Sequence, residues 1–174
     1  MSDRWVGSSP SASSARVEST ADNARSAESR YALLMQPVIV RSGNSLRNEI
    51  EAGPHRMIAD EPASAGGTET GPTPYDFLAA ALGTCTSMTL HVVAKREKIP
   101  LEGVEITVEN DRMHAKDCAD CLTASGYIHR FTVVIKLIGT LTPEQRARML
   151  DVAKRCPVHK TLTSEIRIDE RLAE

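Results

Sequence analysis

The longest run of apolar and small residues in the chain is "FLAAALGTCTSMTLHVVA", at positions 77–94. Thr73 can cap a helix before it, Pro74 suits the first helical position, and Asp76 lies three residues after the cap, as in a capping box. Pro100 ends the pattern. We therefore predict one long helix here. Because it is apolar or small on every side, we expect it at a domain centre or between subunits.

Strand patterns lie on both sides of this helix. The β-rich segment at 31–40 is followed by the turn signal "SGN", which predicts a hairpin into "SLRNEIEAG" at 45–53. A third short strand is expected within "HRMIADEP" at 55–62. Further on, "VEITVEN" at 104–110 alternates strictly, and "YIHRFTVVIKLIG" at 127–139 predicts a longer strand.

The C-terminal part begins with a second capping signature. Thr142, Pro143 and Gln145 predict a helix over "PEQRARMLDVAKR", at 143–155. Pro157 disfavours helical geometry at Cys156, so this helix should end there and a new helical turn should begin. We expect "SEIRIDERL", at 164–172, to be a short strand. The order of these elements predicts an α+β fold.

The chain divides into a polar tail and one domain. Residues 1–29 are rich in serine and alanine and have no sustained apolar period, which predicts a flexible tail. Residues 30–174 are expected to form a single folded domain.

Charge and composition exclude several classes of protein. The net charge is −2 and aromatic residues make up only 3% of the chain, so we expect no nucleic-acid partner. We also expect no membrane partner, because no stretch approaches the roughly 20 apolar residues of a membrane span. No signal segment is recognised at the start, which predicts a cytoplasmic protein with mostly reduced cysteines.

Cys156 is the cysteine with the most favourable local sequence for reactivity. As the cap of a turn that begins at Pro157, its sulfur would face free N–H groups, which favour a thiolate. Positive side chains nearby act in the same direction: Lys154, Arg155, His159 and Lys160. The alternative is a small residue that fills space at a corner between two helices.

Cys85 lies near the middle of the long helix, between Thr84 and Thr86. A free cysteine in such a place is commonly a core residue. To act as a nucleophile it needs a cation from elsewhere in the fold. The available suppliers are arginines of the N-terminal strands: Arg41, Arg47 and Arg56.

A third group of candidate residues has the spacing His114-x3-Cys118-x2-Cys121. These side chains suit zinc, and three protein ligands would make an open or incomplete zinc site. A fourth ligand could be His55, His129 or water. The alternatives are two loop thiols or a reversible disulfide.

The two cysteine segments together resemble a known family. "GPTPYDFLAAALGTCTSMTL" followed by "CPVHKTL" is similar to the OsmC/Ohr family of thiol peroxidases, over roughly Tyr31 to Leu172. "HRMIADEP" and "HAKDCADC" look closer to OsmC-like domains that are sometimes fused to α/β-hydrolases. The resemblance implies an intertwined homodimer, in which curved antiparallel sheets enclose two long helices per chain at the dimer centre.

The resemblance also implies an activity in the oxidative stress response, like that of peroxiredoxins. Cys85 would be the peroxidatic thiol, which reduces an organic hydroperoxide to an alcohol and becomes a sulfenic acid. Cys156 would resolve it as a Cys85–Cys156 disulfide, and a dithiol reductant would restore both thiols. No cofactor is implied.

Two positions depart from the family pattern. The family's glutamate ten residues before the first cysteine is replaced by Tyr75, and Asp76 beside it is the candidate substitute. Arg41 best matches the arginine that activates the thiolate. A competing hypothesis is a non-enzymatic protein that binds a metal or a small thiol through His114, Cys118 and Cys121. Another is a dimeric scaffold without turnover.

Overall fold

The computed structural model describes residues 36–119, 121, 123 and 125–173. The predicted tail at 1–29 and the first residues of the predicted domain, 30–35, lie outside this part of the chain.

The described residues form an α+β arrangement, as predicted. The elements, in chain order, are β1 (Val38–Ser42), β2 (Asn48–Ala52), β3 (His55–Ala59), the single-turn helix η1 (Ala63–Ala65), α2 (Pro74–Glu97), β4 (Gly103–His114), the single-turn helix η2 (Ala115–Asp117), β5 (Tyr127–Ile138), α3 (Pro143–Ala153) and α4 (Pro157–Leu162).

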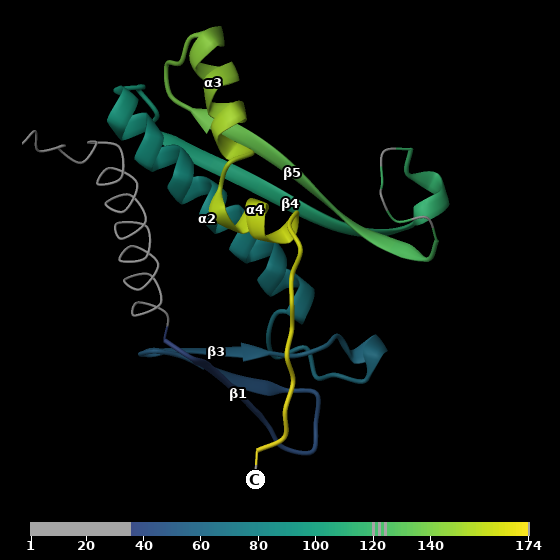
Figure 1. Cartoon of the computed structure of the whole chain (residues 1–174). Coiled ribbons are helices and arrows are strands. Elements are labelled where there is room, and N and C mark those ends of the chain that lie inside the picture. The colour runs from purple at the N-terminus through teal and green to yellow at the C-terminus, as the bar shows by residue number, and fades with distance from the viewer. Residues whose placement is uncertain (1–35, 120, 122, 124, 174) are drawn as a thin grey trace, which may run out of the picture.

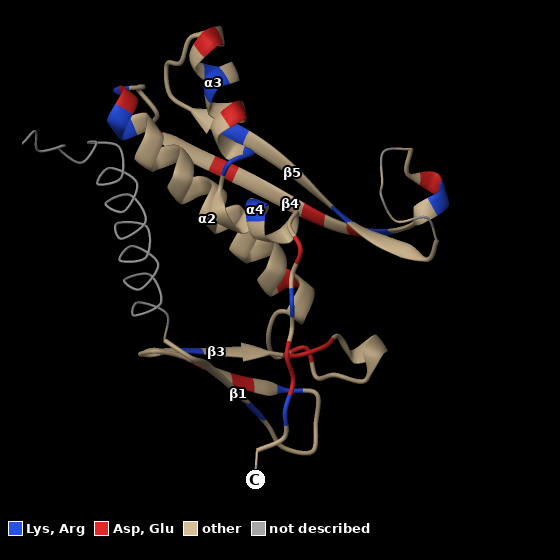
Figure 2. Ribbon diagram, in the orientation of Figure 1, with Lys and Arg blue, Asp and Glu red and all other residues tan. Residues whose placement is uncertain are grey.

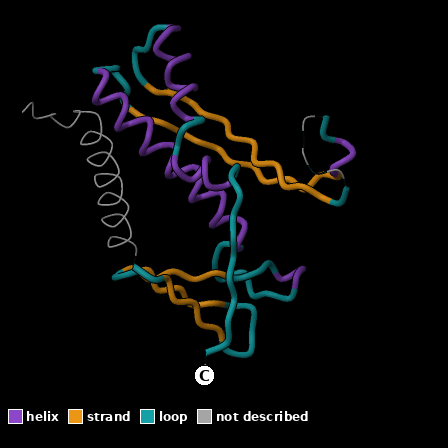
Figure 3. The backbone as a smooth tube through the Cα atoms, in the orientation of Figure 1, coloured by secondary structure: helices purple, strands orange, loops and turns teal. Residues whose placement is uncertain are grey.

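The strands form two antiparallel sheets. β1, β2 and β3 make a three-stranded meander, and β4 and β5 pair along their whole length, from Gly103 opposite Ile138 to His114 opposite Tyr127. The long β4–β5 hairpin lies along α2, and the three-stranded sheet lies near the N-terminal end of that helix (Figure 1). Figure 3 shows the two sheets as separate groups of strands. The predicted hairpin of β1 and β2 is confirmed, and the strands expected within 55–62, 104–110 and 127–139 are present as β3, β4 and β5.

α2 begins where its capping signature predicts. The Thr73 hydroxyl accepts a hydrogen bond from the Asp76 amide (3.2 Å), and Asp76 Oδ2 accepts one from the Thr73 amide (2.8 Å). Lys98 ends the helix in the left-handed conformation, with φ 55°. Figure 2 shows that the charged residues of the 24-residue helix α2 gather at its two ends, so the turns between these ends are uncharged. This distribution suits both the helix dipole and a position in the interior.

The core lies where α2, α3 and the β4–β5 hairpin meet. Leu90 and Met149 are completely buried there. The other buried members of the cluster are Val93, Ala94, Leu141, Val152 and Ala153. Apolar residues of both strands, such as Ile106 and Ile135, pack against this cluster. Burial of this area is the main favourable contribution to the fold.

The opposite face of α2 is not covered by the described residues of this chain. Met88 and Val92 are 68% and 66% exposed, and Leu78 is also exposed. The expectation that no segment is long and apolar enough to cross a membrane is wrong for α2, which meets both requirements. The expectation failed because it required consecutive apolar residues. The threonines and serine of this helix break the run, but the mean hydropathy of the helix stays high. One face of α2 nevertheless packs in the core described above, through Leu90, Val93 and Ala94.

An ion-pair cluster joins the end of α2 to α3. Arg148 donates from Nη2 to Glu97 Oε1 (2.7 Å) and from Nε to Glu97 Oε2 (3.1 Å), and Arg96 donates to the same carboxylate (3.1 Å). The hydrogen bonds from Arg148, and then those from Arg96, lower the pKa of Glu97 from 4.5 to about 2. A bidentate pair of this kind fixes the register of the two helices.

This cluster predicts a loss of stability in acid. Because the pKa of Glu97 is lower in the folded state, its contribution is fully present above pH 4.5 and is lost as the pH falls towards 2. Between pH 6 and pH 3, the melting temperature of the Glu97→Gln variant should therefore fall less than that of the wild type. Thermal unfolding followed by circular dichroism at both pH values measures the difference. Equal losses in the two proteins would contradict the assignment.

Asp60 organises the loop between β3 and α2. It is 2% exposed, and its carboxylate accepts hydrogen bonds from the amide and the hydroxyl of both Thr68 and Thr70, and from the Glu61 amide. The Thr68 hydroxyl, and then Thr70 and the Glu61 amide, hold the pKa of Asp60 well below its usual value, although burial acts in the opposite direction. The loop also needs Gly67, because a Cβ there would overlap the Glu61 carbonyl.

The predicted C-terminal strand is not formed. Residues 165–173 have no regular secondary structure, and no other strand of the described chain pairs with them. Ile166, Ile168 and Leu172 are exposed. The alternation of apolar and polar residues gave this segment a strand pattern, but a strand also requires a neighbour to pair its backbone groups.

Candidate active site

Cys156 caps α4, as its sequence predicts. α3 ends at Ala153, and Cys156 has extended backbone angles (φ −64°, ψ 144°) immediately before Pro157. Its Sγ accepts a hydrogen bond from the His159 amide (3.2 Å). The residue is completely buried, so its thiol faces the interior rather than solvent.

Thr86 of α2 is the side chain that meets this thiol. Its hydroxyl donates to Cys156 Sγ (3.3 Å), and Thr86 is itself only 2% exposed. The contact spans 70 residues of sequence and joins α4 to the middle of α2. Thr86 was not among the site residues predicted from the sequence. The available signal was a hydroxyl on the buried side of an otherwise apolar helix, where a polar group requires a partner.

Cys85 directly precedes Thr86 in α2. It is half-buried, and both Cys85 and Cys156 are free thiols. Its carbonyl accepts a hydrogen bond from the Thr89 hydroxyl (2.7 Å), and Thr84 makes a similar bond back to Ala80. The fold therefore brings the Cys156 sulfur to the same turn of α2 that carries Cys85.

A cavity of about 350 Å³ opens beside these residues. It lies between α2, β5, α3 and α4, and most of its lining is apolar, including Leu82, Phe131 and Leu162. Thr86 and His159, which both donate to Cys156 Sγ, also line it. The cavity can hold a small apolar molecule next to the turn that carries the two thiols.

The structure does not bring Arg41 or Asp76 to Cys85. Arg41, on β1, forms an ion pair with Glu51 (3.0 Å). Asp76 Oδ2 accepts hydrogen bonds from the amide and the hydroxyl of Thr73, as part of the helix cap. Within the described part of this chain, neither residue forms a hydrogen bond or an ion pair with Cys85. Their roles at the thiol remain predictions.

Tyr75 makes a contact that sequence analysis missed. Its ring stacks on that of His129, with the centroids 5.2 Å apart and an angle of 18° between the planes. His129 lines the cavity, so the stack connects the first turn of α2 to the cavity wall in β5. The two residues are 54 positions apart, and no local pattern indicates that they meet.

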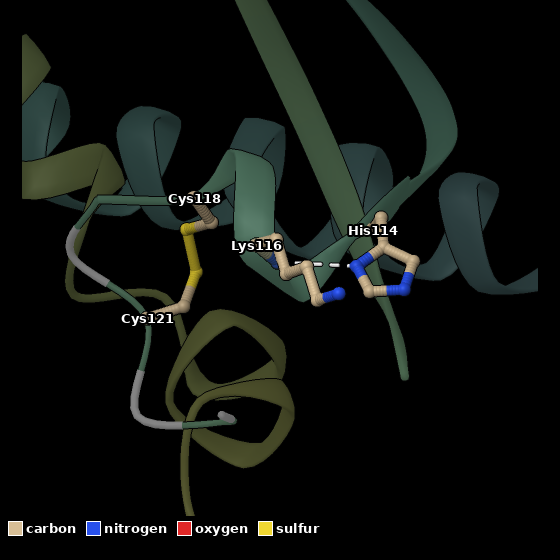
Figure 4. Close-up of a disulfide and its surroundings, with 4 residues drawn as sticks. All are labelled: His114, Lys116, Cys118 and Cys121. Atoms are coloured by element: carbon tan, nitrogen blue, oxygen red, sulfur yellow. Dashed lines mark hydrogen bonds between the residues drawn. A yellow bond between two sulfur atoms is a disulfide. The ribbon is translucent and has the colours of Figure 1, made fainter. Parts of the chain in front are cut away.

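The three candidate zinc ligands do not form a ligand set. Cys118 and Cys121 are joined by a disulfide, and His114 Nδ1 accepts a hydrogen bond from the Lys116 amide (3.2 Å), as Figure 4 shows. Sulfurs bonded to each other cannot bind zinc as thiolates. The described residues contain no cluster of three or more potential metal ligands. Of the alternatives weighed for this motif, the disulfide is the arrangement present.

Comparison with known proteins identifies the family of this chain. The model of the family described as OsmC-like protein matches residues 66–171, which is more than half of the chain. The chain belongs to the OsmC-like family. The match includes both Cys85 and Cys156. A search of curated proteins found no match.

Solved structures share the OsmC-like fold. An OsmC-like protein from Mycoplasma pneumoniae is 18% identical with a TM-score of 0.59, over 72% of this chain and 85% of that one. The organic hydroperoxide resistance protein OhrB of Bacillus subtilis is 24% identical (TM-score 0.55; 75% and 92%). The organic hydroperoxide resistance protein OsmC from Legionella pneumophila is 19% identical (TM-score 0.55; 74% and 90%). At these identities the likeness shows the fold.

Proposed function

We propose that this OsmC-like protein is a thiol-dependent peroxidase that reduces organic hydroperoxides to alcohols. The observation that carries the proposal is the hydrogen bond from Thr86 to Cys156 Sγ, which places one thiol against the residue next to the other. The apolar cavity beside this contact suits an organic hydroperoxide better than hydrogen peroxide. Two of the structural relatives are named as organic hydroperoxide resistance proteins.

In the first step the Cys85 thiolate attacks the terminal oxygen of the hydroperoxide. A sulfur–oxygen bond forms while the oxygen–oxygen bond breaks, so the sulfur is oxidised and the peroxide is reduced. The alkoxide leaves, takes up a proton and becomes the alcohol. Cys85 remains as a sulfenic acid.

In the second step the Cys156 sulfur attacks the Cys85 sulfenic acid. A disulfide forms and the hydroxyl group leaves as water, with the proton of the Cys156 thiol. A dithiol reductant then restores both thiols and becomes a disulfide itself. Burial of Cys156 protects it from direct oxidation, which suits a resolving residue better than an attacking one.

Arg41 and Asp76 are proposed to support the Cys85 thiolate. Both hydrogen bonds that Asp76 accepts from Thr73 are made by Oδ2, so Oδ1 is the oxygen that an arginine would use. Arg41 would have to leave Glu51, with which it pairs at an exposed position. An exposed pair is weak enough to be exchanged.

The same proposal includes a cytoplasmic homodimer. The exposed apolar face of α2, with Leu78, Met88 and Val92, is the surface that a second copy would cover. Covering it would explain a helix that is apolar on every side.

The proposal is tested by a peptide map of the reduced protein after one equivalent of tert-butyl hydroperoxide. A Cys85–Cys156 disulfide that a dithiol reverses is the expected product. A chain in which neither residue is oxidised while the peroxide persists would contradict the proposal.

Thr86 is expected to hold the resolving thiol in its resting position, from which the Cys156 sulfur must move to reach Cys85. The Thr86→Val variant loses the hydrogen bond to Cys156 Sγ, so disulfide formation should become about three- to tenfold faster, the value of one modest hydrogen bond. Formation of the Cys85 sulfenic acid should be unchanged, and Thr86→Ser should restore the rate. Stopped-flow oxidation with acid quench and mass spectrometry separates the two steps. Slowing of both steps in Thr86→Val would contradict this role and would indicate a general disturbance of α2.

A further inference from the structure

The tip of the β4–β5 hairpin carries a second pair of cysteines. Cys118 follows η2, its amide donates to the Ala115 carbonyl (3.2 Å), and its sulfur is bonded to that of Cys121 (Figure 4). The two residues are three positions apart, the Cys-x-x-Cys spacing of many exchangeable dithiols. We propose that Cys118 and Cys121 form a second redox centre, which exchanges two electrons with an external dithiol/disulfide couple.

This pair is distant from the proposed peroxidase site. Gly83, one turn before Thr86, faces Val108, and Val108 pairs with Val133 in β5. From Val133 to Tyr127, at the tip, the strand runs six residues, or about 20 Å at 3.3 Å per residue. The hairpin extends beyond α2 to this tip (Figure 1). Within one chain the two cysteine pairs are therefore separate centres.

The tip has its own stabilising contacts. The Ala115 amide donates a hydrogen bond to the Gly126 carbonyl (2.8 Å). The Tyr127 ring contacts the His114 ring edge-on. The Arg112 guanidinium lies over the Tyr127 ring, with its Cζ 4.3 Å from the ring centroid. None of these residues belongs to the core cluster around Leu90 and Met149. The disulfide closes only a short loop, so it constrains the unfolded chain less than a long-range bridge would. Opening it leaves the fold intact.

The two sulfurs differ in access, which sets the order of exchange. Cys121 is exposed and Cys118 is half-buried. An incoming thiolate attacks Cys121 Sγ, a mixed disulfide forms, and Cys118 leaves as a thiolate. The donor's second thiol, once deprotonated, then attacks the donor sulfur that is bonded to Cys121. This step releases Cys121 as a thiolate. The donor departs as a disulfide, and the two cysteines take up the two protons.

The test uses the full-length chain with Cys85→Ser and Cys156→Ser, so that peroxide chemistry cannot contribute. The protein is equilibrated without denaturant in mixtures of reduced and oxidised dithiothreitol, quenched with acid, alkylated and mapped by mass spectrometry. We expect Cys118 and Cys121 to open and close together and reversibly, with an unchanged circular dichroism spectrum. If the Cys118–Cys121 disulfide is reduced only after denaturant is added, the proposal is overturned and the disulfide is a structural one.

Two further arms complete the test. The same titration of the wild-type chain, with the Cys118–Cys121 peptide followed alone, gives the answer if the double variant fails to fold. Replacing dithiothreitol with glutathione tests whether the electron donor must be a dithiol or can be a monothiol. Incomplete reduction by glutathione supports a dithiol donor, and equal reduction by both overturns that assignment.

The order of attack has its own measurement. In the same background, the lone thiol of Cys118→Ser should react with 5,5′-dithiobis(2-nitrobenzoate) at least about tenfold faster than that of Cys121→Ser, because Cys121 is the accessible sulfur. Equal rates would overturn the assigned order.

Discussion

Replacing Cys85 with serine is expected to abolish peroxide reduction, with a fall in turnover of at least about a thousandfold. A serine hydroxyl is a poor nucleophile at neutral pH and cannot form a sulfenic acid that Cys156 would resolve. The measurement is the consumption of tert-butyl hydroperoxide coupled to dithiothreitol. The change is nearly isosteric, so the fold should be retained, as the melting temperature will show.

Matched variants make this result specific. The Cys156→Ser variant should still form the Cys85 sulfenic acid, which a dimedone adduct detects, but should not form the disulfide. The Cys118→Ser, Cys121→Ser double variant should keep its peroxide turnover. Two results would show that the peroxidatic residue is not on α2. One is normal peroxide turnover in Cys85→Ser, and the other is a loss of turnover only in the Cys118→Ser, Cys121→Ser variant.

Replacing Asp60 with asparagine is expected to give the largest loss of stability. Asparagine keeps the size of the side chain, but only one of its two terminal groups is an acceptor. Its NH₂ group would meet either the donors from Thr68 and Thr70, which now share one carboxylate oxygen, or the Glu61 amide, which uses the other oxygen. Buried donors without acceptors are costly, so the melting temperature should fall by about 10 °C. Thermal unfolding at neutral pH measures it.

The neighbouring Glu61 provides the control. Glu61→Gln also removes one carboxylate from the same loop, but none of the described hydrogen bonds uses the Glu61 side chain. Its melting temperature should stay within about 2 °C of the wild type. Equal melting temperatures for Asp60→Asn and Glu61→Gln would show that the stability of the loop does not depend on the Asp60 carboxylate.

Local sequence signals predicted the helices well. Thr73 with Asp76, and Thr142 with Gln145, form the predicted capping boxes, since each box involves residues only three positions apart. The cap at Cys156 was predicted for a similar reason, because Pro157 limits the backbone of the residue before it.

Features that depend on distant residues were not predicted. Asp60 gains its partners only when the loop folds back by eight to ten residues, and Thr86 meets Cys156 only after α3 and α4 have packed on α2. The strand expected at 164–172 failed for a related reason. Alternation at Ile166 and Ile168 indicates a preference, but a sheet partner is a property of the whole fold.

The contact between Thr86 and Cys156 has a consequence for the timing of the reaction cycle. Successive residues of a helix point about 100° apart, so a sulfur that meets the Thr86 side chain does not face the side chain of Cys85. A Cys85–Cys156 bond therefore requires α4, only six residues long, to move across α2 and give up the hydrogen bond from Thr86. The lifetime of the sulfenic acid would then be set by the motion of this short helix, and more viscous solvent should lengthen it.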